Sequence, residues 1–551
     1  MRRWSELRPG GPGLHPFMLI AAAALWLTVA ANAALWRELL GLHLLSGPRG
    51  FLFGVAAGAL VFCAIVALLA PLAWRATLKP AIVLLLLVAA GAAHFMLTYG
   101  IVLDAAMLTN VLQTNPGEAA DLLGARLLVT LLVLGVLPSL WVWRAPVRAL
   151  PWSRRAWQNA ALTAGALLAC VGVMLAAFQP LSSAMRNHRH VRHLVNPLNV
   201  VQALGQIAAQ PFRRDESVVL PLGEDARPGP TYATQAKPPL LVLVLGETAR
   251  ADHFALNGYA RPTTPELARE GVASFRNAWS CGTSTAASVP CMFSHLGREA
   301  FEGRKNNFES LVDVLQHAGL AVLWIDNQAG CKGVCARVPT VATSALKHPT
   351  WCADGECHDE IMLDGLDARI AALPAERRAR GIVIVMHQMG SHGPAYAKRT
   401  PAAFKRFGPE CTSNVLQDCT SEQLVDAYDN TIVYTDHFLA ETIRWLKARE
   451  DRVEPALAYL SDHGESLGEN NLYLHGLPYA VAPDVQKHIP WITWLSPALG
   501  QRRGVDTVCL EAKGSTRITH DNLFHSVLGL MDVQTAVYRR ELDAYSGCKI
   551  G

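Results

Sequence analysis

Residues 240–248 read Leu-Leu-Val-Leu-Val-Leu-Gly-Glu-Thr, a run of apolar side chains that ends in a glycine, a carboxylate and a hydroxyl. A short apolar run bounded by polar residues is typical of a strand buried on both faces of a parallel sheet. Similar runs recur at 321–325, 382–386 and 456–460, and helical patterns lie at 308–318 and about 421–447. The longer helix is expected to begin with a capping box of Thr420 and Gln423. This alternation predicts an α/β domain with a mainly parallel sheet over residues 238–551.

Polar residues follow three of these runs, at the point where each strand ends. They are Glu247 after the first run, His387 and His392 after residue 386, and Asp462 and His463 after residue 460. Ligands of open α/β sheets gather at the carboxyl ends of strands, and zinc accepts carboxylate oxygens and imidazole nitrogens. One such ending could merely cap a loop, but three together predict a metal site. The hydroxyl-rich loop 280–291 could place a nucleophile beside it.

The first third of the chain is strongly apolar. Charged residues make up 17% of the whole sequence, against about 25% in soluble domains. Five apolar runs approach the roughly 20 residues that cross a bilayer; they lie at about 17–36, 51–70, 80–99, 123–143 and 157–178. We therefore expect five transmembrane helices within residues 1–180. The first run could instead be a signal peptide, because Ala31-Asn32-Ala33 resembles a cleavage site.

Lysine and arginine are concentrated in alternate loops. They occur in residues 2–8, 75–79 and 144–155, whereas residues 100–122 contain none. The positive-inside rule then places the N-terminus in the cytoplasm and everything after about residue 180 outside. Three arginines in 186–192 disagree with this pattern; the segment lies either on anionic headgroups or in a solvated turn.

Cysteine placement also indicates export. Ten of the 12 cysteines lie beyond residue 280, and an even set at short spacings is typical of disulfides in an oxidising compartment. Neighbours would pair as Cys281–Cys291, Cys331–Cys335, Cys352–Cys357 and Cys411–Cys419, leaving Cys509 with Cys548. A zinc site built on these cysteines fits poorly, because the Cys-x3-Cys and Cys-x4-Cys pairs are not followed by paired histidines at finger spacing.

Two further features concern the connector and the charge. Residues 181–237 become rich in proline, glycine and charge towards their end, which predicts a connector between the two domains. The formal net charge of +4 is too weak to indicate a nucleic-acid-binding protein. We expect a monomer that works on the membrane.

Five motifs together are more specific than any one of them. They are GET at 246–248, SCGTSTAASVPCMFS at 280–294, GCKGVC at 330–335, GSHGP at 390–394 and SDHGESLGENNLYLHG at 461–476. With the apolar runs, they make nearly the whole chain resemble the phosphoethanolamine–lipid A transferases. This is a membrane branch of the alkaline phosphatase superfamily that includes the mobile colistin-resistance enzymes. The resemblance implies a sulfatase-like catalytic domain in the periplasm and an anchor in the bacterial inner membrane.

The resemblance also implies roles for individual residues. A zinc ion would be held by Glu247, Thr285, Asp462 and His463. Thr285 would be the nucleophile. The phosphoryl oxygens, or a second and weaker zinc, would be held by Lys332, His392 and His475. Lys332 could instead be a solvated loop lysine and His475 a surface residue, and His387 is expected behind the site or in the core.

A further set lies in the loop between the third and fourth apolar runs. Asn110, Thr114 and Glu118 are spaced four residues apart, so on a helix they would share one face. The family suggests that this face meets an ethanolamine headgroup, with Glu118 offsetting the ammonium. The alternative is a wet interfacial helix.

The implied reaction has two steps. Thr285 attacks the phosphorus of phosphatidylethanolamine, and a lipid A phosphate then takes the group from the threonine. The added ammonium would lower the negative surface charge that polymyxins seek. One alternative is another enzyme on the same scaffold: a phosphoglycerol transferase, a phosphodiesterase or a sulfatase. The other alternative is a non-catalytic lipid-binding protein. A sulfatase is disfavoured because Thr285 cannot become formylglycine.

Overall fold

The computed structural model describes residues 13–113, 116–213, 218–353 and 355–548. The chain forms two compact units: Met1–Leu108 with Leu123–Ile207, and Thr109–Leu122 with Ala208–Gly551. The segment Thr109–Leu122 lies between apolar helices in the sequence, yet it is grouped with the C-terminal unit. The domain boundaries expected at residues 180 and 237 stay predictions.

Within the described part of the first unit, four helices are long and apolar enough to cross a membrane. One is α3 (Gly47–Leu69) continued by η2 (Ala70–Leu72), and the next is α4 (Leu78–Thr98). Another joins α7 (Ala125–Thr130), η3 (Leu131–Val136) and α8 (Leu137–Arg144). The last is α9 (Trp152–Ala176). A fifth span results if α1 (Pro16–Val29) and α2 (Ala33–Gly41), bent by 42°, count as one. The first expected span is therefore a bent pair of helices.

The bend between α1 and α2 lies at two buried asparagines. Asn32 donates its side-chain amide to the Leu27 carbonyl at 2.9 Å and accepts from the Asn196 backbone N–H at 2.9 Å. Asn196 donates its side chain to the carbonyls of Ala31 and Ala89 at 2.9 and 2.8 Å. Polar backbone groups freed at the bend are thus bonded inside the protein, as apolar surroundings require.

The fourth span is interrupted by a proline. Pro138 has no N–H to donate to the carbonyl of Leu134, four residues earlier. That carbonyl accepts from the indole Nε1–H of Trp26 in α1 at 3.1 Å. The adjoining turn Leu131–Val136 is π-helical, a local adjustment that such breaks produce.

After the fifth span the chain continues as helices. They are α10 (Phe178–Asn187), η4 (Arg189–Leu194) and α11 (Leu198–Arg213). The basic segment at 185–190 covers the end of α10 and the start of η4. Its position on headgroups or in solvent stays a prediction.

The second unit is built on an eight-stranded sheet with the order β15-β4-β14-β11-β3-β10-β6-β7. The strands are β3 (Pro239–Gly246), β4 (Ala273–Trp279), β6 (Ala321–Asp326), β7 (Thr340–Ala342), β10 (Ile382–His387), β11 (Glu454–Ser461), β14 (His488–Leu495) and β15 (Ile518–Thr519). Only β14 runs antiparallel to its neighbours. Every residue of β3 is buried, which confirms the strand expected from 240–245 and the mainly parallel sheet.

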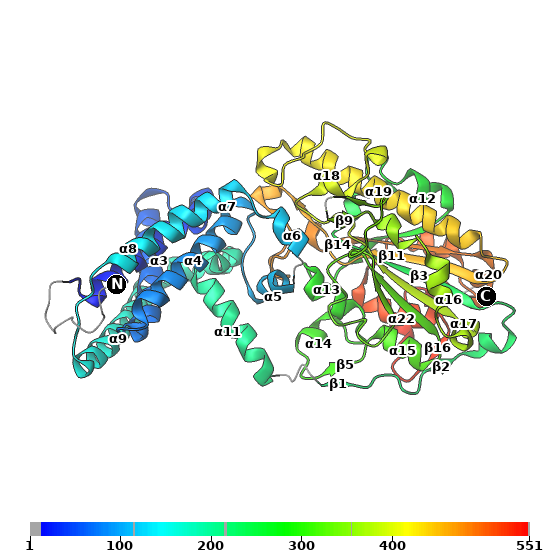
Figure 1. Cartoon of the computed structure of the whole chain (residues 1–551), viewed down its shortest axis with the longest axis horizontal. Coiled ribbons are helices and arrows are strands. Elements are labelled where there is room, and N and C mark those ends of the chain that lie inside the picture. Colours follow the sequence, from blue (N-terminus) through cyan, green and yellow to red (C-terminus); the bar gives the residue numbers. More distant parts are fainter. Residues whose placement is uncertain (1–12, 114–115, 214–217, 354, 549–551) are drawn as a thin grey trace. The chain divides into compact units, whose positions relative to one another are not determined.

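Helices cover both faces of this sheet (Figure 1). The helices α12 (Pro265–Glu270) and α19 (Ser421–Lys447) lie on one face, and α15 (Leu311–His317) and α22 (Leu523–Leu530) lie on the other. The second face holds the main core, in which Leu241, Leu243 and Leu245 of β3 pack with residues of α15 and α22. The capping box of Thr420 and Gln423 is present at the start of α19. The α/β architecture expected from the sequence is thus confirmed.

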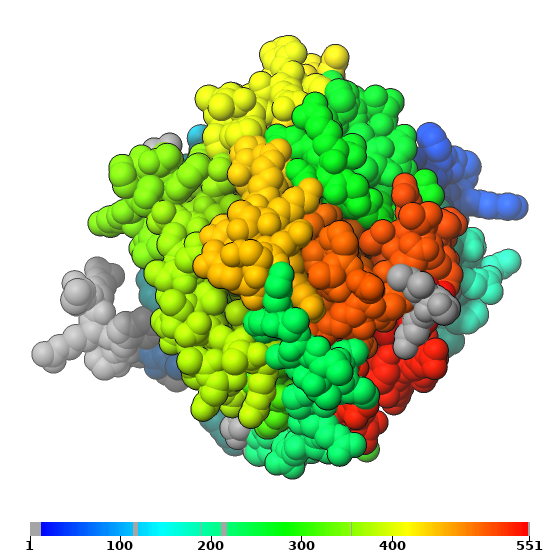
Figure 2. All heavy atoms as spheres, turned by 90° about the vertical axis from the view of Figure 1, so that its right-hand side faces the viewer, coloured from blue at the N-terminus to red at the C-terminus, as the bar shows by residue number. Residues whose placement is uncertain are grey.

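Two helices far apart in the sequence meet at the surface of this unit. In Figure 2 the green segment that includes α12 adjoins the gold end of α19. Arg444 and Lys447 of α19 form ion pairs with Glu266 and Glu270 of α12 at 2.6 and 2.5 Å. Because both cations are more than two-fifths exposed, these pairs add little stability; packing holds the helices together.

The second unit also contains short helices and two-stranded pairs. The pairs are β1 (Val219–Leu220) with β5 (Asn307–Phe308), β2 (Arg227–Pro228) with β16 (Val533–Gln534), β8 (Cys352–Ala353) with β9 (Glu356–Cys357), and β12 (Ser466–Leu467) with β13 (Tyr473–Leu474). The helices that matter below are α5 (Ala105–Gln113), α6 (Pro116–Asp121), α13 (Thr285–Met292) and α18 (Tyr396–Arg399). Thr109–Gln113 of α5 and the whole of α6 belong to this unit.

Five disulfides lie in the second unit. They join Cys281 to Cys291, Cys331 to Cys335, Cys352 to Cys357, Cys411 to Cys419, and Cys509 to Cys548. These are the pairs that the sequence spacing suggests. Cys63 and Cys170, both in apolar helices, are free.

The cysteine pattern gives the first prediction. Protein purified without reductant and denatured should be alkylated at only two cysteines, Cys63 and Cys170, and at all 12 after reduction. Mass spectrometry of proteolytic peptides measures both states. Alkylation of any other cysteine before reduction would contradict this set of disulfides.

Candidate metal centre and active site

The centre is built by two neighbouring strands. In the parallel pair β3 and β11, Gly246 lies opposite Ser461, so Glu247 and Asp462 leave the sheet side by side. The Asp462 N–H donates to the Gly246 carbonyl at 2.9 Å, which continues the ladder by one more bond. The strand register thus fixes the two carboxylates next to each other.

His463 completes a buried group with these carboxylates. Its Nε2 lies 3.3 Å from an oxygen of Glu247 and 3.3 Å from Asp462 Oδ2, and all three residues are at most 1% exposed. Burial raises the pKa of Asp462 to about 6, and the adjacent charge of Glu247 acts in the same direction. Burial also acts to raise the pKa of Glu247, but His387 and His463 hold it well below its usual range. A nearby cation would favour the charged form of both buried carboxylates.

The residues present fit a metal ion. Asp462 Oδ2 and His463 Nε2 are buried and have no hydrogen-bond partner. Leaving such atoms without a partner is costly, so a cation bound there would be stabilised. Among the described residues, Glu247, Asp462 and His463 form one group whose ligand atoms lie within 4.8 Å of one another. Carboxylate oxygen and imidazole nitrogen suit zinc.

Thr285 stands at the start of a helix beside this group. It is the first residue of α13 and is 3% exposed. Its hydroxyl donates to Glu247, with both carboxylate oxygens at 3.1 Å. The Cys281–Cys291 disulfide ties the preceding loop to the last turns of α13, so the backbone around Thr285 is held from both sides.

A second group of possible ligands shares Glu247. It adds His392 and His475, again with ligand atoms within 4.8 Å. The His475 ring lies 4.2 Å from that of His463 and 5.6 Å from that of His392, centroid to centroid. His475 is 6% exposed, so it is not the surface residue that the sequence left open.

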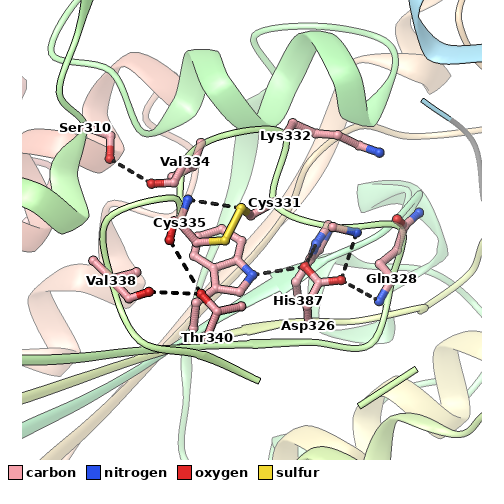
Figure 3. Close-up of a disulfide and its surroundings, with 12 residues drawn as sticks. Ser310, Asp326, Gln328, Cys331, Lys332, Val334, Cys335, Val338, Thr340 and His387 are labelled. Carbon is pink, nitrogen blue, oxygen red and sulfur yellow. Dashed lines mark hydrogen bonds and ion pairs between the residues drawn. A yellow bond between two sulfur atoms is a disulfide. The ribbon is translucent and has the colours of Figure 1, made fainter. Parts of the chain in front are cut away.

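Lys332 lies in the loop closed by the Cys331–Cys335 disulfide (Figure 3). It has a φ of 51°, which is uncommon outside glycine, and its side chain extends away from the disulfide. Its Nζ donates to the carbonyls of Ala329 and Gln113 at 3.0 and 3.3 Å. Lys332 is therefore partly buried and bonded, not a freely solvated lysine.

His387 lies behind the metal group. Its Nδ1 is 3.1 Å from Asp326 Oδ2, and its Nε2 is 3.8 Å from Glu247 Oε2. Asp326 also accepts from the backbone N–H groups of Gln328 and Gly330 at 3.1 and 3.0 Å. One carboxylate, seen in Figure 3, thus orients His387 and organises the turn that leads to Lys332.

The structure places only part of the headgroup set expected on the interhelix loop. Asn110 lies in α5, within the segment Thr109–Leu122 that belongs to the second unit. Thr114 falls outside the described residues, and the side chain of Glu118 is likewise not described. The shared face of these three residues stays a prediction.

Comparison with known proteins assigns the chain to a family. Residues 61–212 match the family described as phosphoethanolamine transferase EptA/EptB, and residues 239–533 match the sulfatase family. Phosphoethanolamine transferase EptA of Escherichia coli (strain K12) is 38% identical over 98% of each chain. The chain belongs to the phosphoethanolamine transferase family of enzymes.

Two further relatives agree with this assignment. Phosphatidylethanolamine transferase Mcr-1 of Escherichia coli is 37% identical to this chain. The match covers 94% of this chain and 95% of Mcr-1. The integral membrane protein lipooligosaccharide phosphoethanolamine transferase A of Neisseria meningitidis superposes with a TM-score of 0.92 at 35% identity, covering 98% of this chain and all of the other. The membrane-plus-catalytic architecture is thus shared over the full length.

Sequence reasoning missed three residues that support the site of the transferase. His520 accepts from the Cys281 N–H at 3.0 Å and bonds the Ser461 carbonyl at 2.9 Å, so it joins the threonine loop to β11. Gln328 donates to Glu247 at 3.1 Å. Asp326 ends the strand run at 321–325, so its position carried the same strand-end signal as Glu247. Gln328 follows the same strand by two residues, whereas His520 is brought in by a chain segment with no such mark.

The metal group gives the second prediction. Asp462→Asn should lower the zinc content of the purified transferase by at least about tenfold, because an amide replaces a charged ligand of the same shape. Elemental analysis measures the bound metal. The control is Asp367→Asn, which breaks an exposed pair with Arg449 elsewhere in the domain and should keep the wild-type content. Equal metal in both variants would remove Asp462 from the ligand set.

Proposed function

We propose that the transferase moves phosphoethanolamine from phosphatidylethanolamine to a phosphate of lipid A, by way of a phosphoethanolamine-threonine at Thr285. The observation that carries this proposal is the Thr285 hydroxyl, 3.1 Å from both oxygens of Glu247 at a buried group that fits a metal. The relatives named above support the transferred group. One more relative, 26% identical over 75% of this chain, is named Kdo(2)-lipid A phosphoethanolamine 7''-transferase and supports the class of acceptor.

In this proposal Glu247, Thr285, Asp462 and His463 hold one zinc tightly. Lys332, His392 and His475 hold the phosphoryl oxygens, or a second and weaker zinc with Glu247. Bound zinc lowers the pKa of a coordinated hydroxyl and screens the charge that develops on phosphorus. Glu247 belongs to both possible ligand groups, one with Asp462 and His463 and the other with His392 and His475.

The first step of the reaction is attack on the donor. The Thr285 hydroxyl points its proton at the Glu247 carboxylate, which leaves an oxygen lone pair for the phosphorus. A bond forms between Thr285 Oγ1 and phosphorus, the bond from phosphorus to the diacylglycerol oxygen breaks, and the proton that Thr285 gives up passes to that oxygen, so that the alcohol leaves neutral. Lys332 supplies a point charge for the phosphoryl oxygens.

The second step returns the threonine. An oxygen of the acceptor phosphate attacks the phosphorus, and Thr285 leaves and regains its proton. The product carries an added ammonium, so the outer surface becomes less negative and attracts polymyxins and other cationic peptides less. Asn110, Thr114 and Glu118 are proposed to meet the ethanolamine headgroup of the donor.

The proposed location is the bacterial inner membrane, with the N-terminus in the cytoplasm and the second unit, which carries the site, in the periplasm. The distribution of lysine and arginine supports this orientation, and so do the five disulfides of the second unit. A monomer is proposed, because one chain carries every residue of the site.

A phosphoglycerol transferase or a hydrolase on the same scaffold is the competing assignment. Full-length protein in lipid nanodiscs should release labelled diacylglycerol from fluorescent phosphatidylethanolamine, and should release little from fluorescent phosphatidylglycerol. Transfer to added lipid A, detected by mass spectrometry, distinguishes a transferase from a hydrolase. Release from phosphatidylglycerol alone would favour the competing assignment, and no release from either lipid would favour a non-catalytic protein.

The nucleophile gives the third prediction. Thr285→Ala should lower diacylglycerol release by at least about a thousandfold, because it removes the hydroxyl that is proposed to carry the group. Thr283→Ala and Ser288→Ala should keep measurable turnover, because Thr283 bonds the Leu477 carbonyl at 2.6 Å and Ser288 has no hydrogen-bond partner. Wild type incubated with donor alone should carry an adduct that maps to Thr285. An adduct elsewhere would assign the nucleophile to that residue.

A further inference from the structure

The segment Thr109–Leu122 carries a buried carboxylate that faces the rest of the second unit, which is called the catalytic unit below. Asp121 is the last residue of α6 and is 8% exposed. The segment is joined in sequence to α4 on one side and α7 on the other, yet its contacts group it with the catalytic unit. A buried carboxylate is costly unless it is paired, so the partners of Asp121 decide what holds the segment there.

Asp121 has three partners in the catalytic unit. Lys398 donates its Nζ to Oδ1 at 2.5 Å, and Arg399 Nη2 lies 3.3 Å from Oδ2. Asn414 donates its side-chain amide to the backbone carbonyl of Asp121 at 2.9 Å. The Lys398 side chain is 46% exposed but that of Arg399 only 1%. The desolvated pair is therefore Asp121 with Arg399.

Arg399 extends this contact to the active site. Its Nε donates to the backbone carbonyl of His392 at 2.9 Å, and its Nη1 pairs with Glu356. The guanidinium is planar and fixes the directions of its donors. A single buried side chain thus ties Asp121 to the backbone of His392, one of the residues proposed to hold the phosphoryl group.

Gln113, in the same segment, contacts a residue that is proposed to bind the phosphoryl group. Lys332 donates its Nζ to the carbonyl of Gln113, the last residue of α5, at 3.3 Å. The segment therefore contacts the catalytic unit at two places. One adjoins Lys332, and the other reaches His392 through Arg399.

We infer that Asp121 and Arg399 form a latch that fastens the interhelix segment 109–122 to the catalytic unit, and that Arg399 positions His392 for the lipid donor. Both are positioning residues. The role of Arg399 in positioning His392 for the donor rests on the proposed function. The fastening of the segment does not, because it can be measured without any reaction.

The pairing of Arg399 makes the latch testable without unfolding the domain. In Asp121→Asn the guanidinium keeps Glu356 and the His392 carbonyl as partners, so no buried charge is left alone. A matched control is Glu454→Gln, which makes the same carboxylate-to-amide change beside the buried Arg502, 2.9 Å away. Glu454 begins β11, whereas Asp462 follows its end, so the control lies at the opposite end of this strand from the site.

The first arm of the test is hydrogen–deuterium exchange on the full chain in nanodiscs. Peptides that cover residues 109–122 should exchange at least about fivefold faster in Asp121→Asn than in wild type. The Glu454→Gln control should leave them unchanged. Wild-type exchange of this segment in Asp121→Asn would overturn the latch, whatever the enzyme does.

The second arm is kinetic, with phosphatidylethanolamine as the donor. Asp121→Asn should raise KM about tenfold with kcat within about twofold of wild type, the pattern of lost uniform binding, because the unfastened segment no longer holds its proposed headgroup residues in place. Arg399→Lys, which keeps the charge but loses the planar fork, should lower kcat as well, because it also loosens His392. If exchange rises and KM stays at the wild-type value, the latch holds the segment but has no role in donor binding, and that half is overturned.

The two arms separate this inference from the proposed function. If wild type releases no diacylglycerol, the proposed function fails while the exchange result still decides the fastening. If Arg399→Lys does not fold, Asp121→Asn alone still tests the latch, since its residue lies on the segment itself. A melting temperature equal to that of Glu454→Gln excludes general destabilisation as the cause of faster exchange.

Discussion

The juxtaposition of Glu247 and Asp462 at the ends of two hydrogen-bonded parallel strands is the constraint on which the catalytic unit depends. The register of β3 and β11 forces two buried carboxylates next to each other. A cation and several donors must therefore gather around them. His463, Gln328 and the Thr285 hydroxyl all bond or face this pair, and helix α13 and its disulfide bring the hydroxyl there.

Much of the fold and the centre of the site could be predicted from the sequence, because both follow from local patterns. Uninterrupted apolar runs predicted the central strands, and polar residues at their ends predicted Glu247, Asp462 and His463. Asp326 obeys the same rule one strand further along and could have been found by it. The bend in the first span could not be predicted, since Asn32 is hydrogen-bonded there to Asn196, 164 residues later.

Contacts between distant segments account for the rest. His520 approaches Cys281 across 239 residues, and Arg399 approaches Asp121 across 278. Neither residue stands in a motif whose spacing indicates its partner. Such residues owe their roles to the way the chain closes on itself, and only the three-dimensional arrangement identifies them.

The bond from Trp26 to the Leu134 carbonyl also bears on how the protein is made. The donor precedes the acceptor by 108 residues, so the ribosome completes the first apolar helix long before the proline-interrupted one emerges. Pro138 cannot bond this carbonyl, and a carbonyl without a partner is costly in apolar surroundings. Because the donor is synthesised first, the partner of this carbonyl is already part of the chain when the fourth span emerges.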